Sequence, residues 1–266
     1  MKRIGLTEKE LEVLETALVQ YGAVITFSQL NDLFREDREY LRKRISKLTE
    51  LGWLKRIKRG LYVISDLSSR GSLPISHFAI TNLFVENAYV SFESALQHHG
   101  WYDQLLTKIS SVSLKQYKDT VIDGYTYTFV KTQPDYFHGW QSYQIDGQSV
   151  KIADREKALI DLIQFHRSRY SVDLVLEKLI TYKDELDLQH LINLVLQATL
   201  AVQRIMGFLL DCSGQNSEQL WSSLVTKKGI AILSQSKNNV YNGKWKLYYD
   251  QYFSQYARNS TDQKPT

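Results

Sequence analysis

The sequence has 266 residues, of which 43% are hydrophobic and 12% aromatic, and its formal net charge is +4. This composition is atypical of disordered proteins, and the length fits two domains. No apolar run approaches the roughly 18 residues that span a bilayer, and no apolar segment follows the basic N-terminus as in a signal peptide. The single cysteine, Cys212, excludes an internal disulfide. We therefore expect a cytoplasmic protein without a membrane partner.

The positive charge is concentrated in one segment. Residues 35–60 contain ten basic and four acidic residues, a net charge of +6, which leaves −2 for the rest of the chain. A basic block on a nearly neutral protein is typical of a localised site for a polyanion such as nucleic acid. A solvated helix face gives the same pattern, so charge alone leaves both interpretations open.

The first predicted elements are two helices. Thr7 and Glu10 have the spacing of a capping box, which predicts a helix that begins there and ends at Gly22. A short connector follows. Ser28 is then expected to cap a second, shorter helix over residues 29–34.

A third helix and a hairpin complete the N-terminal pattern. Asp37 is expected to cap a helix that runs to about Leu51. Residues 53–64 contain two β-prone runs around a basic turn with a glycine, which predicts a hairpin. Three short helices followed by a basic hairpin is the order of a winged helix, so we assign residues 1–65 to a winged helix-turn-helix and 66–75 to a linker.

The remaining chain has a mixed pattern, and residues 76–254 are expected to form one larger domain. Helical spacing occurs in residues 75–85, 91–99, 154–167, 172–182, 188–212 and 218–227. β-Prone runs cover residues 109–114, 125–131, 142–145, 149–152, 230–233 and 244–249. Residues 255–266 are polar and are expected to form a flexible tail. The predicted fold class is α+β: an N-terminal winged helix-turn-helix followed by a larger mixed α/β domain with a helical C-terminal part.

The third helix is the expected reading helix for double-stranded DNA. Leu41, Ile45 and Leu48 define its buried side, so its opposite and flanking positions face the major groove. Lys47, the hairpin turn and the start of the second helix are expected to contact phosphates. The expected DNA-binding residues are Ser28, Gln29, Arg38, Glu39, Tyr40, Arg42, Lys43, Lys47, Lys58 and Arg59. Alternatively, the domain packs on the rest of the chain and binds no DNA.

We find no enzyme motif, and we expect no cofactor and no metal. The six histidines lack zinc-site spacing, and His98 and His99 are adjacent on a predicted helix, where neighbouring side chains diverge. Asp154 and the charged residues after it, as far as Asp161, are interpreted as a helix cap with surface ion pairs. Cys212 lies at the end of an apolar helix and is expected to be a core residue.

Six segments carry a family resemblance, and one of the more telling is SFESALQHHG at 91–100. The others are residues 51–54, 58–62, 150–161, 204–210 and 245–247. Taken in chain order, the six segments resemble the AbiEi family. The members of this family are the antitoxin and transcriptional-repressor components of abortive-infection, type IV toxin–antitoxin systems. The resemblance covers about residues 7–253.

The resemblance implies a phage-defence role. The protein would repress its own operon through repeated operator sites near the promoter. It would also neutralise a partner toxin of nucleotidyltransferase type without forming a stable complex with it. Two other classes stay open from the residues alone: a protein-interaction module with an accessory winged helix, and a nucleic-acid-acting enzyme that the winged helix targets.

Overall fold

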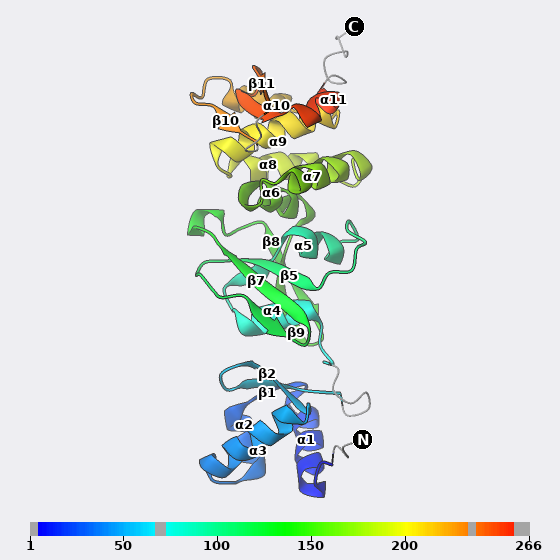
Figure 1. The fold of residues 1–266 in the computed structure, drawn as a ribbon, viewed down its shortest axis with the longest axis vertical. Coiled ribbons are helices and arrows are strands. Elements are labelled where there is room, and N and C mark those ends of the chain that lie inside the picture. The colour runs from blue at the N-terminus through cyan, green and yellow to red at the C-terminus, as the bar shows by residue number, and fades with distance from the viewer. Residues whose placement is uncertain (1–4, 67–72, 234–237, 258–266) are drawn as a thin grey trace.

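The computed structural model describes residues 5–66, 73–233 and 238–257. The fold is mixed α+β, as expected, and consists of an N-terminal unit, a central sheet unit and a helical C-terminal unit stacked along the long axis (Figure 1). Residues 67–72 of the expected linker and 258–266 of the expected tail lie outside the described residues.

The N-terminal unit combines three helices with a small antiparallel sheet. The strand order is β1-β3-β2, with β3 paired to both neighbours. The helices and strands are α1 (Glu8–Tyr21), β1 (Val24–Thr26), α2 (Phe27–Phe34), α3 (Arg38–Glu50), β2 (Leu54–Lys58) and β3 (Leu61–Ile64). The predicted hairpin is therefore confirmed.

The helix ends of this unit follow from local side-chain chemistry. The capping box of Thr7 with Glu10 is confirmed, and the Asp37 side chain accepts from the backbone at the start of α3. The cap predicted at Ser28 is wrong. Thr26 caps α2 instead, in a second capping box with Gln29, so the helix begins at Phe27. Two reciprocal hydrogen bonds satisfy two helix-end donors, which a Ser28 cap would leave unpaired.

The small sheet is covered on both faces. Tyr62 and Ile64 of β3 pack with the three helices, whereas the alternate residue, Val63, packs with Ile57 into the core of the central unit. Lys55 of β2 forms an ion pair with Asp123 of the central unit at 3.0 Å. The N-terminal unit is thus docked on the central one through the sheet face that is opposite to its helices.

The central unit is built on a six-stranded mixed sheet of order β6-β7-β5-β4-β9-β8. Two of its strands, β4 and β6, were not predicted. Each has three residues, and β4 is buried throughout, so it lacks an alternating pattern. The elements are α4 (His77–Phe84), β4 (Ala88–Val90), α5 (Phe92–His98), β5 (Lys108–Ser113), β6 (Thr120–Ile122), β7 (Tyr125–Lys131), η1 (Pro134–Tyr136), β8 (Trp140–Ile145) and β9 (Gln148–Ala153).

The C-terminal unit is a helical layer that ends in a second small sheet of order β10-β12-β11. The predicted single helix over 188–212 is two helices, because Thr199 caps a new helix. Residues 255–257 are helical rather than part of a tail. The elements are α6 (Arg155–Phe165), α7 (Arg169–Thr181), α8 (Leu188–Leu196), α9 (Leu200–Cys212), α10 (Glu218–Leu224), β10 (Ala231–Ile232), β11 (Asn239–Asn242), β12 (Leu247–Asp250), η2 (Gln251–Phe253) and α11 (Ser254–Ala257).

A buried charge network joins two of the segments that carry the family resemblance. Lys157 and Asp161 of α6 form an ion pair at 2.7 Å and are 2% and 0% exposed. The hydroxyls of Ser91 and Tyr89 donate to the other oxygen of Asp161, at 2.7 and 3.1 Å. The prediction of surface ion pairs is therefore wrong for this pair. Cys212 is buried, as predicted.

Candidate nucleic-acid interface

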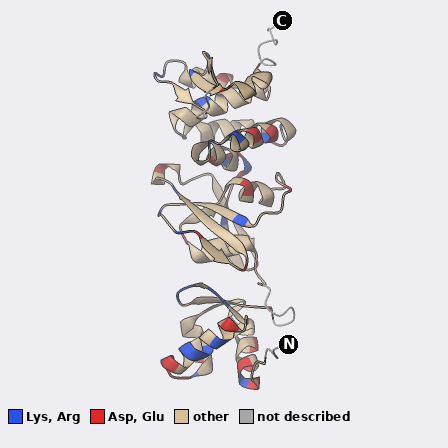
Figure 2. Ribbon diagram, viewed as in Figure 1, with Lys and Arg blue, Asp and Glu red and all other residues tan. Residues whose placement is uncertain are grey.

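Helix α3, which the sequence analysis expects to read DNA, presents its charged side to solvent. Leu41, Ile45 and Leu48 are buried, as the apolar spacing predicted, while Arg38 and Arg42 are exposed. Figure 2 shows Lys and Arg concentrated on α3 and on the β2–β3 hairpin. These two elements lie on the same side of the N-terminal unit.

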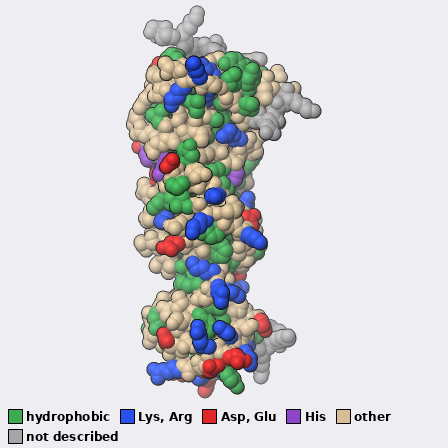
Figure 3. Space-filling view, turned by 90° about the vertical axis from the view of Figure 1, so that its left-hand side faces the viewer, with side chains coloured by type: hydrophobic (Ala, Val, Ile, Leu, Met, Phe, Trp, Pro, Cys, Tyr) green, Lys and Arg blue, Asp and Glu red, His purple; other side chains and the backbone are tan. Residues whose placement is uncertain are grey.

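A groove of about 720 Å³ separates α3 from the hairpin. Four arginines line it, two from α3 and two from the hairpin, and two aromatic rings lie between them. Figure 3 shows Lys and Arg side chains around a small hydrophobic patch on this unit. The lining residues are Phe27, Arg38, Arg42, Arg56, Arg59, Gly60 and Tyr62.

Backbone contacts hold the hairpin against α2. Arg56 lies directly across from Tyr62 in the β2–β3 pairing, so both side chains share one face of the sheet. The N–H of Phe27 donates to the carbonyl of Gly60 at 2.9 Å. Gly60 has a φ of +77°, a conformation that glycine adopts without steric cost, and this allows the tight turn after Arg59.

The four arginines of this groove, Arg38, Arg42, Arg56 and Arg59, are exposed. Among the described residues, none of them forms an ion pair with a carboxylate. Arg38 lies 5.9 Å from the centre of the Phe27 ring, a weak cation–π contact. The guanidinium groups are therefore available for a polyanion, and we call this surface the arginine groove.

Other basic residues of the segment serve the fold instead. Arg44 binds Glu36 at 2.8 Å and Glu10 at 2.9 Å, and Lys47 lies 3.3 Å from Glu10. Burial alone would raise the pKa of Glu10, but hydrogen bonds from Thr7 and Lys47 outweigh it and hold that pKa below its ordinary value. The Arg44 guanidinium likewise lowers the pKa of Glu36. Lys47, expected to contact phosphate, is thus partly neutralised by an internal counterion.

The remaining predicted residues lie around the arginine groove rather than in it. Glu39 and Lys43 form an exposed ion pair at 3.1 Å on the next face of α3, and Tyr40 beside them is 69% exposed. The side-chain oxygen of Gln29 accepts hydrogen bonds from Thr26 in the capping box of α2. The last two expected DNA-binding residues, Ser28 and Lys58, are exposed but do not line the groove.

Four residues that line the arginine groove are absent from the expected DNA-binding set: Phe27, Arg56, Gly60 and Tyr62. Arg56 is the charged residue among them. Its position across from Tyr62 depends on the register of β2 against β3, which shifts between Arg56 and Lys58. Alternation along β2 places Arg56 on the same face as buried Leu54, and this is the signal that could have found it.

In residues 5–66, 73–233 and 238–257, no group of three or more His, Cys, Asp or Glu side chains is placed to hold a metal ion. Within the same ranges, no helix has the length and apolar character needed to cross a bilayer.

Comparisons with known proteins show the fold alone. No family model matches the chain, and no curated protein matches it. A solved structure, that of the RV2827C protein from Mycobacterium tuberculosis, has a similar fold with a TM-score of 0.65. The match covers 97% of this chain and 96% of that one at 13% sequence identity. The similarity thus extends over all three units.

Proposed function

We propose that the N-terminal unit is a winged helix-turn-helix that binds double-stranded DNA. The arginine groove carries this proposal, because four exposed guanidinium groups without internal counterions converge from α3 and from the hairpin. The element order α1-β1-α2-α3-β2-β3 is that of a winged helix. In this class of domain the third helix enters the major groove and the hairpin follows the backbone beside it.

The two halves of the groove would have different roles. Arg38 and Arg42 lie in the N-terminal half of α3, from which reading helices reach base edges, and an arginine can bind guanine through two hydrogen bonds. Arg56 and Arg59 on the hairpin would bind phosphates. Lys43 would add to the positive potential only after releasing Glu39, which costs little for an exposed pair.

We expect Arg42→Gln and Arg56→Gln each to weaken binding to the protein's own promoter by about tenfold to a hundredfold, which corresponds to about 1–3 kcal/mol. Arg42→Gln should also reduce the preference for promoter over unrelated DNA. Arg56→Gln should weaken both alike and flatten the slope of log affinity against log salt by about one. Fluorescence anisotropy with labelled duplexes at several salt concentrations measures all three quantities.

Arg35→Gln is the matched control. Arg35 is an exposed arginine at the end of α2 that does not line the groove, so its loss removes the same charge from the same unit. Its replacement should change affinity far less than that of Arg42 or Arg56. Equal losses for all three variants would reduce the interaction to general electrostatic attraction and contradict the proposed interface.

We further propose that the protein is a repressor of its own operon and an antitoxin of the AbiEi type. The resemblance of six ordered segments supports this, together with a DNA-binding unit joined to a larger one that has its own core. The partner is a nucleotidyltransferase-type toxin that is not stably bound. The two activities would belong to different units, with repression in the N-terminal one.

The full-length double variant Arg42→Gln, Arg56→Gln separates the two activities. Expressed from a foreign promoter, it should relieve growth arrest by the toxin as well as the unchanged protein does, yet fail to repress its own promoter in a reporter assay. The full chain is preferable to a fragment, because removal of the N-terminal unit would expose the apolar surface that packs on Ile57 and Val63. A folded double variant that no longer protects cells would place antitoxicity in the DNA-binding surface.

A further inference from the structure

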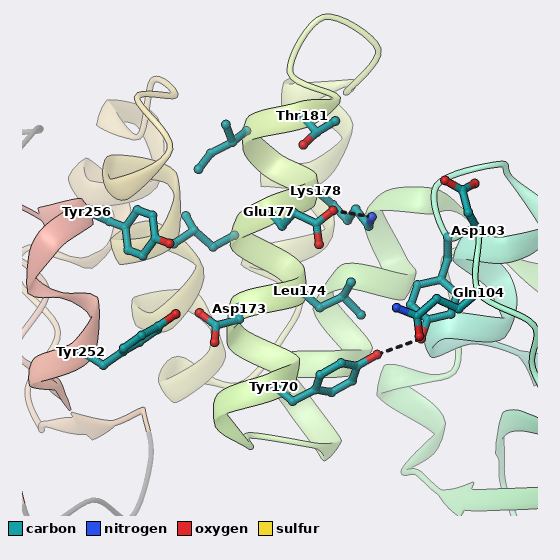
Figure 4. Close-up of a pocket in the computed structure, with 13 residues that line it drawn as sticks. Asp103, Gln104, Tyr170, Asp173, Leu174, Glu177, Lys178, Thr181, Tyr252 and Tyr256 are labelled. Atoms are coloured by element: carbon teal, nitrogen blue, oxygen red, sulfur yellow. Dashed lines mark hydrogen bonds and ion pairs between the residues drawn. The ribbon is translucent and has the colours of Figure 1, made fainter.

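A second groove, of about 590 Å³, runs along the exposed side of α7 in the C-terminal unit (Figure 4). One wall is the segment after α5, with Tyr102 and Asp103, and the other is the end of the described chain, with Tyr252 and Tyr256. We call it the tyrosine groove. Figure 1 places α7 in the helical layer, on the other side of the central sheet from the N-terminal unit.

The tyrosine groove has the composition of a protein-binding surface. Tyr170 of α7 is 51% exposed, and Leu105, which follows Gln104 on the rim, is 85% exposed. The hydroxyls of Tyr170 and Tyr102 are hydrogen-bonded at 3.0 Å, and Tyr102 also donates to Gln104, so these rings are held in place. Tyrosines that are ordered before binding give large contact area at low entropic cost, which is why they are enriched at interfaces.

The charges in this groove are mainly negative. Its lining contains three carboxylates, Asp103, Asp173 and Glu177, and one ammonium group, that of Lys178. Arg169, which borders the groove on Tyr252, adds a second positive charge and leaves a net charge of −1. Lys178 is already paired with Glu177 at 2.8 Å and its side chain is 10% exposed. A cationic partner is therefore favoured over an anionic one.

The chain itself supplies an example of the contact that this groove can make. The guanidinium carbon of Arg169 lies 3.8 Å from the centre of the Tyr252 ring. Asp173 lies beside Tyr252 in the groove (Figure 4) and interacts electrostatically with Arg169. A cation on a tyrosine face beside a carboxylate is a favourable arrangement.

We propose that the tyrosine groove binds a basic polypeptide segment of a partner protein. Arginine or lysine side chains of that segment stack on Tyr170 and Tyr256 and pair with Asp103, while its apolar side chains contact Leu105. A groove of this size fits a weak, salt-sensitive contact. Such a contact goes beyond DNA binding and is compatible with a partner that is not stably bound.

The probe is a short fluorescein-labelled peptide of arginine-alanine-leucine repeats, titrated with the full-length protein. We expect micromolar binding that weakens with salt, and no binding of a peptide with glutamine in place of arginine. The triple variant Asp103→Asn, Asp173→Asn, Glu177→Gln should bind the arginine peptide about tenfold or more weakly, and Tyr170→Ala should weaken it severalfold.

The control variant Glu8→Gln, Glu12→Gln, Glu15→Gln removes the same charge from exposed positions on α1 and should leave peptide binding unchanged. Equal losses in both triple variants would overturn the proposal, as would equal binding of the glutamine peptide. Displacement of the peptide by spermidine at matching affinity would assign the groove to a small polyamine instead. Promoter binding should be unaffected in the groove variants, so this test can fail independently of the proposed DNA interface.

Discussion

Replacement of Asp161 by alanine is expected to lower the free energy of unfolding by about 3–5 kcal/mol, because it leaves the buried ammonium group of Lys157 without its counter-charge. The pair is almost fully inaccessible, and Asp161 also accepts from the hydroxyls of Ser91 and Tyr89. The substitution therefore removes the hydrogen-bond acceptor of three buried groups, the Lys157 ammonium and the Ser91 and Tyr89 hydroxyls. These groups lie where α6 contacts β4 and α5. Urea unfolding of the variant and of the unchanged protein measures the difference.

The exposed ion pair between Glu39 and Lys43 is a matched control. It has the same spacing on a helix, but its side chains are 74% and 71% exposed. Glu39→Ala should cost no more than about 0.5 kcal/mol, because solvent screens the pair. The double variant Lys157→Met, Asp161→Leu should recover much of the stability lost in Asp161→Ala, since apolar side chains of similar volume need no counter-charge. A loss below about 1 kcal/mol for Asp161→Ala would contradict the network as described.

Replacement of Gly207 by alanine is expected to destabilise the C-terminal unit by about 3 kcal/mol, the upper end of the usual cost of overpacking. A Cβ atom at this position would lie 2.2 Å from the Trp245 ring. The ring is 1% exposed, and its N–H donates to Asp211 at 2.7 Å, so it cannot move aside cheaply. Alanine would otherwise favour the helix by about 1 kcal/mol, so a loss of stability isolates the clash.

A double-mutant cycle tests the cause of this effect. In a Trp245→Leu background, the penalty of Gly207→Ala should shrink to near zero or change sign, because the smaller side chain leaves space for the methyl group. Calorimetric melting of the unchanged protein, the two single variants and the double variant supplies the coupling energy between the two substitutions. An unchanged penalty in the leucine background would attribute the effect of Gly207→Ala to the helix backbone instead of the tryptophan.

Both predictions concern segments that carry the AbiEi resemblance, and the structure gives those segments a packing role. Ser91 and Asp161 join α5 to α6, and Gly207 allows Trp245 to lie against α9. Arg204, one turn earlier, binds the backbone carbonyls of Lys227 and Lys228. The functional surfaces proposed above, the arginine groove and the tyrosine groove, lie mostly outside these segments.

The sequence by itself determined the features that depend on near neighbours. Thr7, Glu10 and Asp37 cap their helices, and the buried stripe of α3 lies where apolar spacing placed it. These contacts span two to seven residues, so local geometry is sufficient to predict them. The α2 cap could also be predicted, because Thr26 and Gln29 have capping-box spacing.

Tertiary structure decided which charges are free and which are internal. Charge alone does not distinguish the ten basic residues between 35 and 60, yet Arg44 and Lys47 bind Glu10, which is 34 and 37 residues away. Arg56 joins Arg42 only through the register of two strands. Burial of Lys157 with Asp161 likewise requires β4 and α5 to cover α6. The electrostatic energy of a charge depends on distance and on surrounding solvent, and packing between distant segments sets both.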